Sequence, residues 1–176
     1  MKAEKPTIEQ ALLGFLRRQP LHGYAIYHQL SDPTGLGLVW RLKLSQLYAL
    51  LNRLEEVGYV TAILEAQASR PPRKVFQLTP AGEAAFLDWV QKPVVHGRSL
   101  RLEFLVKLYF ARREGTDAAV GLVASQRARV EEWLASAENR VQATDDQAFG
   151  RLVNQFRQGQ IEAMLAWLDQ CEDALT

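Results

Sequence analysis

The most informative segment of the chain is Leu44-Ser-Gln-Leu-Tyr-Ala-Leu-Leu-Asn-Arg-Leu-Glu-Glu-Val-Gly58. Its apolar residues recur at three- and four-residue steps, so they line one face of a helix that Gly58 ends. The other face carries Ser45, Tyr48, Ala49, Asn52 and Arg53. A phenol, an amide and a guanidinium beside small groups are suited to reading base edges and holding phosphates, whereas a merely solvated face favours Lys and Glu. The stretch alone fits both a DNA-reading helix and an ordinary amphipathic helix.

The residues that follow favour the DNA-reading interpretation. Residues 59–66 are rich in β-branched and aromatic types, residues 67–72 form turns, and residues 73–79 read Arg-Lys-Val-Phe-Gln-Leu-Thr. This order predicts a two-stranded hairpin with an Arg/Pro-rich tip directly behind a helix. Such a hairpin after a reading helix is typical of a winged helix-turn-helix, whose second helix enters the major groove while the wing contacts the flanking backbone.

Capping signals place further helices before and after this unit. Thr7 with Gln10 forms a capping box, which predicts a first helix over about residues 8–18. A second helix is expected over about residues 24–30. Thr79-Pro80 opens a helix that should end at about Gln91.

Composition limits the class of protein. The chain has 176 residues, of which 48% are hydrophobic, so it has enough apolar material for a core in one or two domains. No apolar run approaches the roughly 18 residues of a membrane span, and the first residues lack a signal peptide, so we expect a cytoplasmic protein. Cys171 is the single cysteine, which excludes a disulfide framework within the chain and a cysteine-rich zinc site. We expect no cofactor and no metal.

The net charge of +1 hides an asymmetry between the two halves of the chain. Residues 1–92 hold 11 Lys/Arg against 8 Asp/Glu, a net of +3, whereas residues 93–176 hold 10 against 12, a net of −2. The basic half contains the reading helix. A dimer would bring two such halves to one duplex and double the electrostatic attraction.

The helical pattern is interrupted at residues 92–97, Lys-Pro-Val-Val-His-Gly, which contain Pro and Gly. We place a domain boundary there. Residues 1–92 are predicted to form a winged-helix DNA-binding domain, and residues 93–176 a helical dimerisation domain. The fold class is therefore mainly α (α+β). The second domain should contain helices over about 99–113, 116–142 and 145–173.

The last helix carries an apolar stripe too broad for a helix exposed to water. Pairing with a second copy of the chain would cover it, and so would folding back within one chain. The residues expected at a dimer interface are Phe156, Ile161, Met164, Leu165 and Leu168.

With these motifs in order, the chain resembles the PadR family of bacterial transcriptional regulators over most of its length. The elements that carry the resemblance are Pro20-Leu-His-Gly-Tyr24, Leu47-Tyr-Ala-Leu-Leu-Asn-Arg-Leu-Glu55 with Gly58, Pro72-Arg-Lys-Val-Phe-Gln-Leu-Thr79, and Ala81-Gly82. The resemblance implies a homodimer that represses a promoter at an inverted repeat, and it fits the longer branch with a full C-terminal helical domain. It also implies that Tyr48 and the start of the reading helix face DNA, with Arg73 and Lys74 beside phosphate.

The chain departs from the family's pattern at the start of the reading helix. Residues 43–46 read Lys-Leu-Ser-Gln where many members have Ser-Pro-Gly-Thr, and Ala49 stands where they have Pro. Ser45 is then expected to cap a slightly shorter helix. The groups nearest the bases also change, so the operator should differ from that of other members.

Roles on double-stranded DNA follow from the chemistry of each side chain. Gln46 and Asn52 are candidates for base edges, because an amide pairs with adenine. The residues expected mainly to hold phosphate are Tyr48, Arg53, Arg70, Arg73 and Lys74. The full set expected at DNA is Ser45, Gln46, Tyr48, Asn52, Arg53, Arg70, Arg73 and Lys74.

An effector is also conceivable, as are other functions. Trp89, Trp133 and Trp167 could line a pocket for a small aromatic effector, or they could be plain packing. A winged-helix module that binds protein and never DNA is the alternative function, although it leaves the basic wing tip unexplained. No catalytic constellation stands out, so we expect no enzyme. His22 and His28 lack a third ligand, so capping or surface roles are expected for them.

Overall fold

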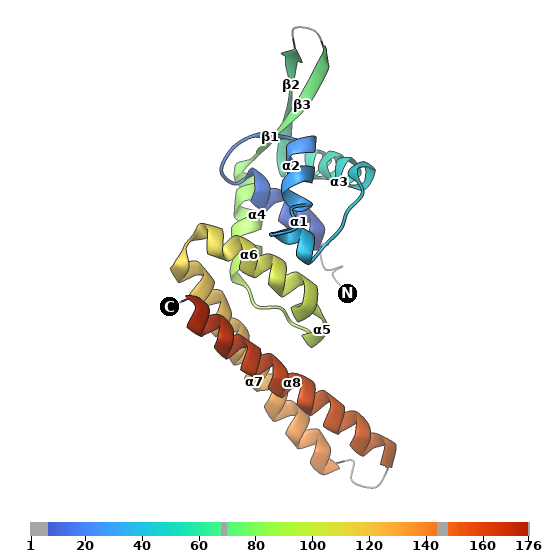
Figure 1. Cartoon of the computed structure of the whole chain (residues 1–176), viewed down its shortest axis with the longest axis vertical. Coiled ribbons are helices and arrows are strands. Elements are labelled where there is room, and N and C mark those ends of the chain that lie inside the picture. Colours follow the sequence, from blue (N-terminus) through green and yellow to red (C-terminus); the bar gives the residue numbers. More distant parts are fainter. Residues whose placement is uncertain (1–6, 68–69, 144–147, 176) are drawn as a thin grey trace. The chain divides into compact units, whose positions relative to one another are not determined.

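The structure is a computed structural model that describes residues 7–67, 70–143 and 148–175 (Figure 1). The chain divides into two compact units. The first, unit 1, comprises residues 1–90 together with 105–110, and the second, unit 2, comprises residues 91–104 and 111–176. The functional boundary proposed between residues 92 and 93 stays a prediction.

Unit 1 contains four helices and a small antiparallel sheet among its described residues. The apolar stripe of the sequence is on the inner side of the third helix, because Leu47, Leu51 and Leu54 are buried there. The helices are α1 (Thr7–Leu16), α2 (Gly23–Leu30), α3 (Leu44–Glu56) and α4 (Pro80–Gln91). The strands are β1 (Leu21–His22), β2 (Val60–Gln67) and β3 (Arg70–Leu78), in the order β1-β3-β2.

Strands β2 and β3 form the predicted hairpin, the wing, which extends beyond the helices of unit 1 (Figure 1). The register pairs Val60 with Leu78 and Glu65 with Arg73. The sequence did not predict β1, in which Leu21 pairs with Phe76. A two-residue strand is too short to show an alternating pattern in the sequence. Here it forms because it pairs with β3.

The start of α4 is fastened to the end of α3. Thr79 Oγ1 donates to Gly58 O at 2.8 Å and accepts from Gly82 N–H at 3.1 Å, so the predicted cap is present. Gly82 approaches the backbone so closely that an added Cβ would lie 2.0 Å from Tyr59 O. Gly58 itself has φ +75, the left-handed conformation that favours glycine after a helix.

Residues 105–110, the first part of α6 (Leu105–Glu114), complete the core of unit 1. The Phe110 ring meets the rings of Phe15 and Phe86 edge-on, with centroids 5.2 Å and 5.6 Å away. Gly14 makes room for it, because a Cβ there would lie 2.6 Å from the Phe110 ring. A sequence segment from beyond the expected domain boundary therefore belongs to the core of the N-terminal unit.

Unit 2 consists mainly of two long helices, α7 (Thr116–Ala143) and α8 (Ala148–Leu175), which lie side by side (Figure 1). Its other elements are α5 (Gly97–Ser99), the π-helical turn η2 (Leu100–Phe104) and the end of α6. The side chain of Gln126, fully buried on α7, accepts from Val94 N–H at 2.7 Å and donates to Val94 O at 3.4 Å. This pair of bonds holds the segment after α4 against α7.

The predicted fold class is confirmed: helices dominate, and a winged helix-turn-helix precedes a helical C-terminal part. Between α2 and α3, a 3-10 turn, η1 (Leu36–Leu38), buries Leu36 and leaves Trp40 half-buried. In the described parts of the chain, no helix is long and apolar enough to cross a membrane.

Candidate nucleic-acid interface

The turn between β1 and α2 sets the position of the helix-turn-helix. His22 is the N-cap of α2, and its Nδ1 accepts from Ala25 N–H at 3.0 Å, which confirms the expected capping role. Gly23 follows, and a Cβ there would lie 2.6 Å from the Tyr48 ring. The Tyr48 ring on α3 therefore rests against the backbone at the start of α2. This contact brings the Leu-His-Gly and Leu-Tyr motifs together in space.

The outward face of α3 carries the side chains that the sequence placed there. Ser45, Gln46, Asn52 and Arg53 are exposed, and Tyr48 keeps 38% of its surface accessible. The opposite face is packed on the core of unit 1. The residues thus form one polar, solvent-facing strip, and their DNA-binding role stays a prediction.

The start of α3 differs from the expected one. The helix begins at Leu44 with Lys43 as N-cap, so Ser45 lies in the first turn and does not cap a shorter helix. Gln46 takes over part of the capping, because its Oε1 accepts from Lys43 N–H at 3.1 Å. The expectation for Ser45 failed because it assumed that a helix needs a Ser-type cap, whereas here the side chain at the third helical position accepts from the backbone N–H of the N-cap residue.

Arg53 is held from within unit 1. Its Nη1 lies 3.3 Å from Oε1 of Glu9 on α1, and the Glu9 side chain is only 8% exposed. The Arg53 side chain keeps 63% of its surface exposed. The buried carboxylate lies behind the exposed guanidinium and restrains it electrostatically, and the sequence pattern contains no signal for this partner.

The wing cations also have carboxylate partners. Arg73 Nε lies 2.8 Å from Glu65 Oε2 across the hairpin, and Lys74 Nζ lies 3.0 Å from Glu55 Oε2 on α3. Their side chains remain 45% and 44% exposed. The Arg70 side chain, also expected at DNA, lies outside the described residues.

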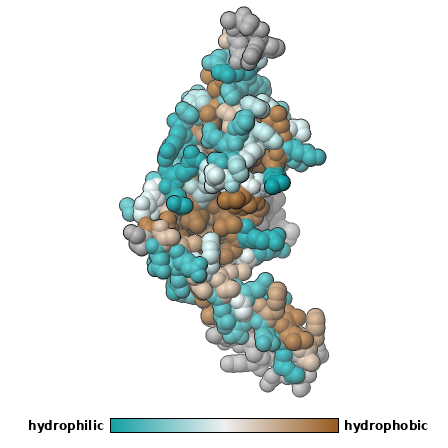
Figure 2. Space-filling model, viewed as in Figure 1, coloured by the Kyte–Doolittle hydropathy of each residue, from teal (hydrophilic) through white to brown (hydrophobic). Residues whose placement is uncertain are grey.

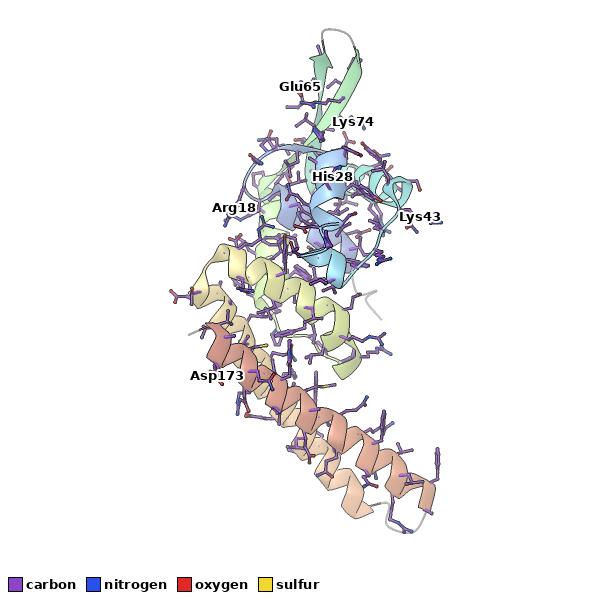
Figure 3. All side chains as sticks on the ribbon, in the orientation of Figure 1. Arg18, His28, Lys43, Glu65, Lys74 and Asp173 are labelled. Carbon is purple, nitrogen blue, oxygen red and sulfur yellow. The ribbon has the colours of Figure 1, made fainter. Side chains whose placement is uncertain are left out.

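The polar strip of α3 and the wing therefore share one charged region. Figure 3 labels Lys43 at the start of α3, and Glu65 and Lys74 on the wing. The ion pair between Lys74 and Glu55 joins the wing to the end of α3. Such an arrangement presents amides, a phenol and three cations from two elements, which suits a duplex with its phosphates and base edges.

The three candidate effector tryptophans are divided between the units. Trp89 belongs to unit 1, where it stacks near Phe86 and under Lys107 Nζ at 5.2 Å. Trp133 and Trp167 belong to unit 2. Trp133 and Met164 lie near Gly97, at 3.7 Å and 3.4 Å from an added Cβ, and Trp167 packs edge-on against Phe104. Their use in a pocket stays a prediction.

The α8 stripe is split between inward and outward residues. Leu168 is fully buried within its own chain, and Ile161, Met164 and Leu165 are half-buried. Phe149, Leu152 and Phe156 are 77%, 64% and 65% exposed. Figure 2 shows apolar surface at the lower right of the view, toward one end of the long helices of unit 2. Folding back accounts for the first group, and the exposed group forms an apolar strip that the described part of the chain leaves uncovered.

Comparisons with known proteins agree with this geometry. Residues 12–88 match the model of the transcriptional regulator PadR-like family, and residues 100–176 match the model named virulence activator alpha C-term. Residues 12–88 thus carry the PadR-like domain, and the chain is a DNA-binding transcriptional regulator similar to members of that family. The curated relatives that match are named as transcriptional regulators.

The individual relatives and solved structures share about a quarter of their aligned residues with this chain. The chain is 27% identical to the negative transcriptional regulator PadR of Bacillus subtilis, over 81% of this chain and 80% of that protein. It is 26% identical to a probable transcriptional regulator of Mycobacterium tuberculosis, over 50% of this chain and 46% of that protein. The crystal structure of Bacillus subtilis PadR in complex with operator DNA is similar in fold, with a TM-score of 0.50 and 23% identity, covering 98% of this chain and 99% of that chain.

Proposed function

We propose that the chain represses transcription as a homodimer bound to an inverted-repeat operator. Two copies of α3 would occupy successive major grooves on one side of the duplex, one helical turn apart. The observation that carries the proposal is the exposed polar strip of α3, flanked by the wing cations Arg73 and Lys74. The relative from Bacillus subtilis that matches most of the chain is named a negative regulator, which supports repression.

Within this proposal the side chains divide into those that contact base edges and those that bind phosphates. Gln46 and Asn52 read base edges, because their amides offer a donor and an acceptor together. Phosphates are held by Tyr48, Arg53, Arg73 and Lys74, which fix the register of the helix in the groove. Arg70 is assigned to phosphate from its charge alone, because its side chain lies outside the described residues.

The dimer would form through the exposed apolar strip of α8. Phe149, Leu152 and Phe156 recur at steps of three and four residues, so they share one face of the helix. A second copy offers the same face, and a two-fold axis lets each strip cover the other. Ile161, Met164 and Leu165 would extend the contact, whereas Leu168 serves packing within the chain.

A small aromatic effector is proposed as the signal that releases DNA. Trp133 and Trp167 in unit 2 are the side chains whose rings would stack on such a ligand. Quenching of tryptophan fluorescence on titration with simple aromatic acids, lost when Trp133 is replaced by Leu, would support this role. Unchanged fluorescence across the series, with DNA binding also unchanged, would argue against it.

The function is tested by titrating the purified chain, by fluorescence anisotropy, against DNA from upstream of its own gene and against the same DNA scrambled. The proposal predicts saturable, selective binding with two subunits per site, weakened by salt. Equal binding to both duplexes would contradict an operator in that DNA. Absence of binding even at low salt would favour a winged-helix module that binds protein.

A further inference from the structure

We propose that Glu65 and Glu55 act as built-in competitors of DNA phosphate at the wing, which lower the affinity for non-operator DNA and so sharpen selectivity. The inference rests on the proposed function and adds a role for acidic residues in it. The observation behind it is that each described wing cation expected at DNA is already paired with a carboxylate.

The geometry makes this competition direct. Glu65 Oε2 lies 2.8 Å from Arg73 Nε, and Glu55 Oε2 lies 3.0 Å from Lys74 Nζ, which are distances of charge-assisted hydrogen bonds. A phosphate oxygen needs the same position on the cation. It must therefore displace the carboxylate or bind with a second anion beside it, and either event weakens the phosphate contact.

Both pairs lie in solvent. The Arg73 and Glu65 side chains are 45% and 54% exposed, and those of Lys74 and Glu55 are 44% and 35% exposed. Exposed pairs contribute little to folding, so their placement is better explained by what they do to an approaching anion. Glu9 differs, because it is buried behind Arg53 and orients that side chain from inside the protein.

The competition should act on selectivity because phosphate contacts carry no sequence information. Every duplex offers the same backbone, so free cations strengthen binding to all sequences alike. Carboxylates that weaken this common contribution leave a larger share of the affinity to the reading residues of α3. The cations still steer and hold the protein once the reading helix is seated.

Glu65→Gln is the decisive variant, because Glu65 and Arg73 lie opposite each other within one hairpin. We expect affinity for scrambled DNA to rise roughly fivefold at physiological salt, and the slope of log K against log salt to steepen by up to about 0.9, the change for one phosphate contact. The ratio of operator to scrambled affinity should fall. Glu55→Gln should act in the same direction through Lys74.

The matched control is Glu132→Gln on α7, which makes the same change in net charge. Glu132 is exposed and also lies 2.8 Å from an arginine, Arg129 Nη1, in unit 2. Its DNA affinity and salt slope should equal those of the unmodified chain. In an Arg73→Gln background, Glu65→Gln should lose its effect.

The proposal is overturned if Glu65→Gln and Glu55→Gln, both folded by circular dichroism, bind scrambled DNA no more tightly than the unmodified chain. Tighter binding by Glu132→Gln to the same degree would also overturn it, since net charge alone would then be the cause. The proposed regulator function is tested separately, by the selectivity of the unmodified chain on the same duplexes.

Discussion

At the scale of single residues, glycines mark the close approaches that hold the DNA-reading unit together. Gly82 lies against the carbonyl of Tyr59, and Gly23 lies against the Tyr48 ring. The sequence showed both glycines as motif positions but not what they touch. Contact partners far apart in the chain leave no periodic signal, so only the folded structure reveals them.

Gly82→Ala should destabilise the fold by about 3 kcal/mol, because its Cβ would overlap a backbone oxygen that cannot move without shifting the start of α4. Thermal or urea unfolding measures the loss. The matched control is Gly121→Ala on α7, where nothing lies within 4 Å of the added Cβ. That variant should stabilise by about 0.5–1 kcal/mol, since alanine favours a helix interior. Equal effects of the two substitutions would contradict the packing at Gly82.

At the scale of elements, one side chain at the start of α3, Gln46, stabilises the helix and is also expected to contact DNA. Gln46 caps the helix through its Oε1 and is also the candidate reader of adenine. Capping uses the amide oxygen as an acceptor, and the amide nitrogen is a separate donor. The sequence predicted the helix and its exposed face, because periodicity records burial. It did not predict the cap, since Lys43 at that position is not a usual capping residue.

Gln46→Glu separates these two roles. A carboxylate still accepts from Lys43 N–H and suits a helix N-terminus, so unfolding should change by less than about 0.5 kcal/mol. The base preference should shift away from adenine, because glutamate has no donor and accepts from cytosine. Selection from a randomised operator library measures the preference. An unchanged consensus sequence would remove Gln46 from the reading set.

Lys74→Ala addresses the wing as an element. We expect weaker binding to operator and scrambled duplexes alike, with a salt slope smaller by up to about 1, because one phosphate contact is lost. The sequence preference should stay the same, in contrast to Gln46→Glu. A change in consensus with unaltered salt dependence would mean that the wing reads bases and does not hold the backbone.

At the scale of the whole molecule, the sequence pattern predicted the helices of unit 2. It did not predict which of their apolar residues pack within the chain and which stay exposed. The apolar stripe on α8 is one continuous pattern in the sequence. In the structure, however, Leu168 is buried within its own chain, whereas Phe149, Leu152 and Phe156 are exposed. Which part of a stripe a neighbouring helix covers depends on how the two helices pack. Likewise, the sequence placed residues 105–110 in the second domain, and the fold gives them to unit 1.

Phe156→Asp should convert a dimer into monomers, with the dissociation constant raised roughly thirtyfold or more, because a charge would enter the centre of an apolar contact. Light scattering after size exclusion measures the mass. Gln155→Asp, at the exposed neighbouring position, is the control and should stay dimeric. A monomeric unmodified chain, or a dimer unaffected by Phe156→Asp, would contradict the proposed interface.

The central claim is that two linked copies of α3 read one face of a duplex, and the spacing of the half-sites tests it most directly. Binding is compared on the selected operator and on the same operator with about 5 bp inserted between its halves, half of a helical turn. We expect the affinity of the dimer for the lengthened operator to fall to its affinity for an isolated half-site, because the second half-site rotates to the far side of the DNA. Undiminished affinity for the lengthened operator would contradict it.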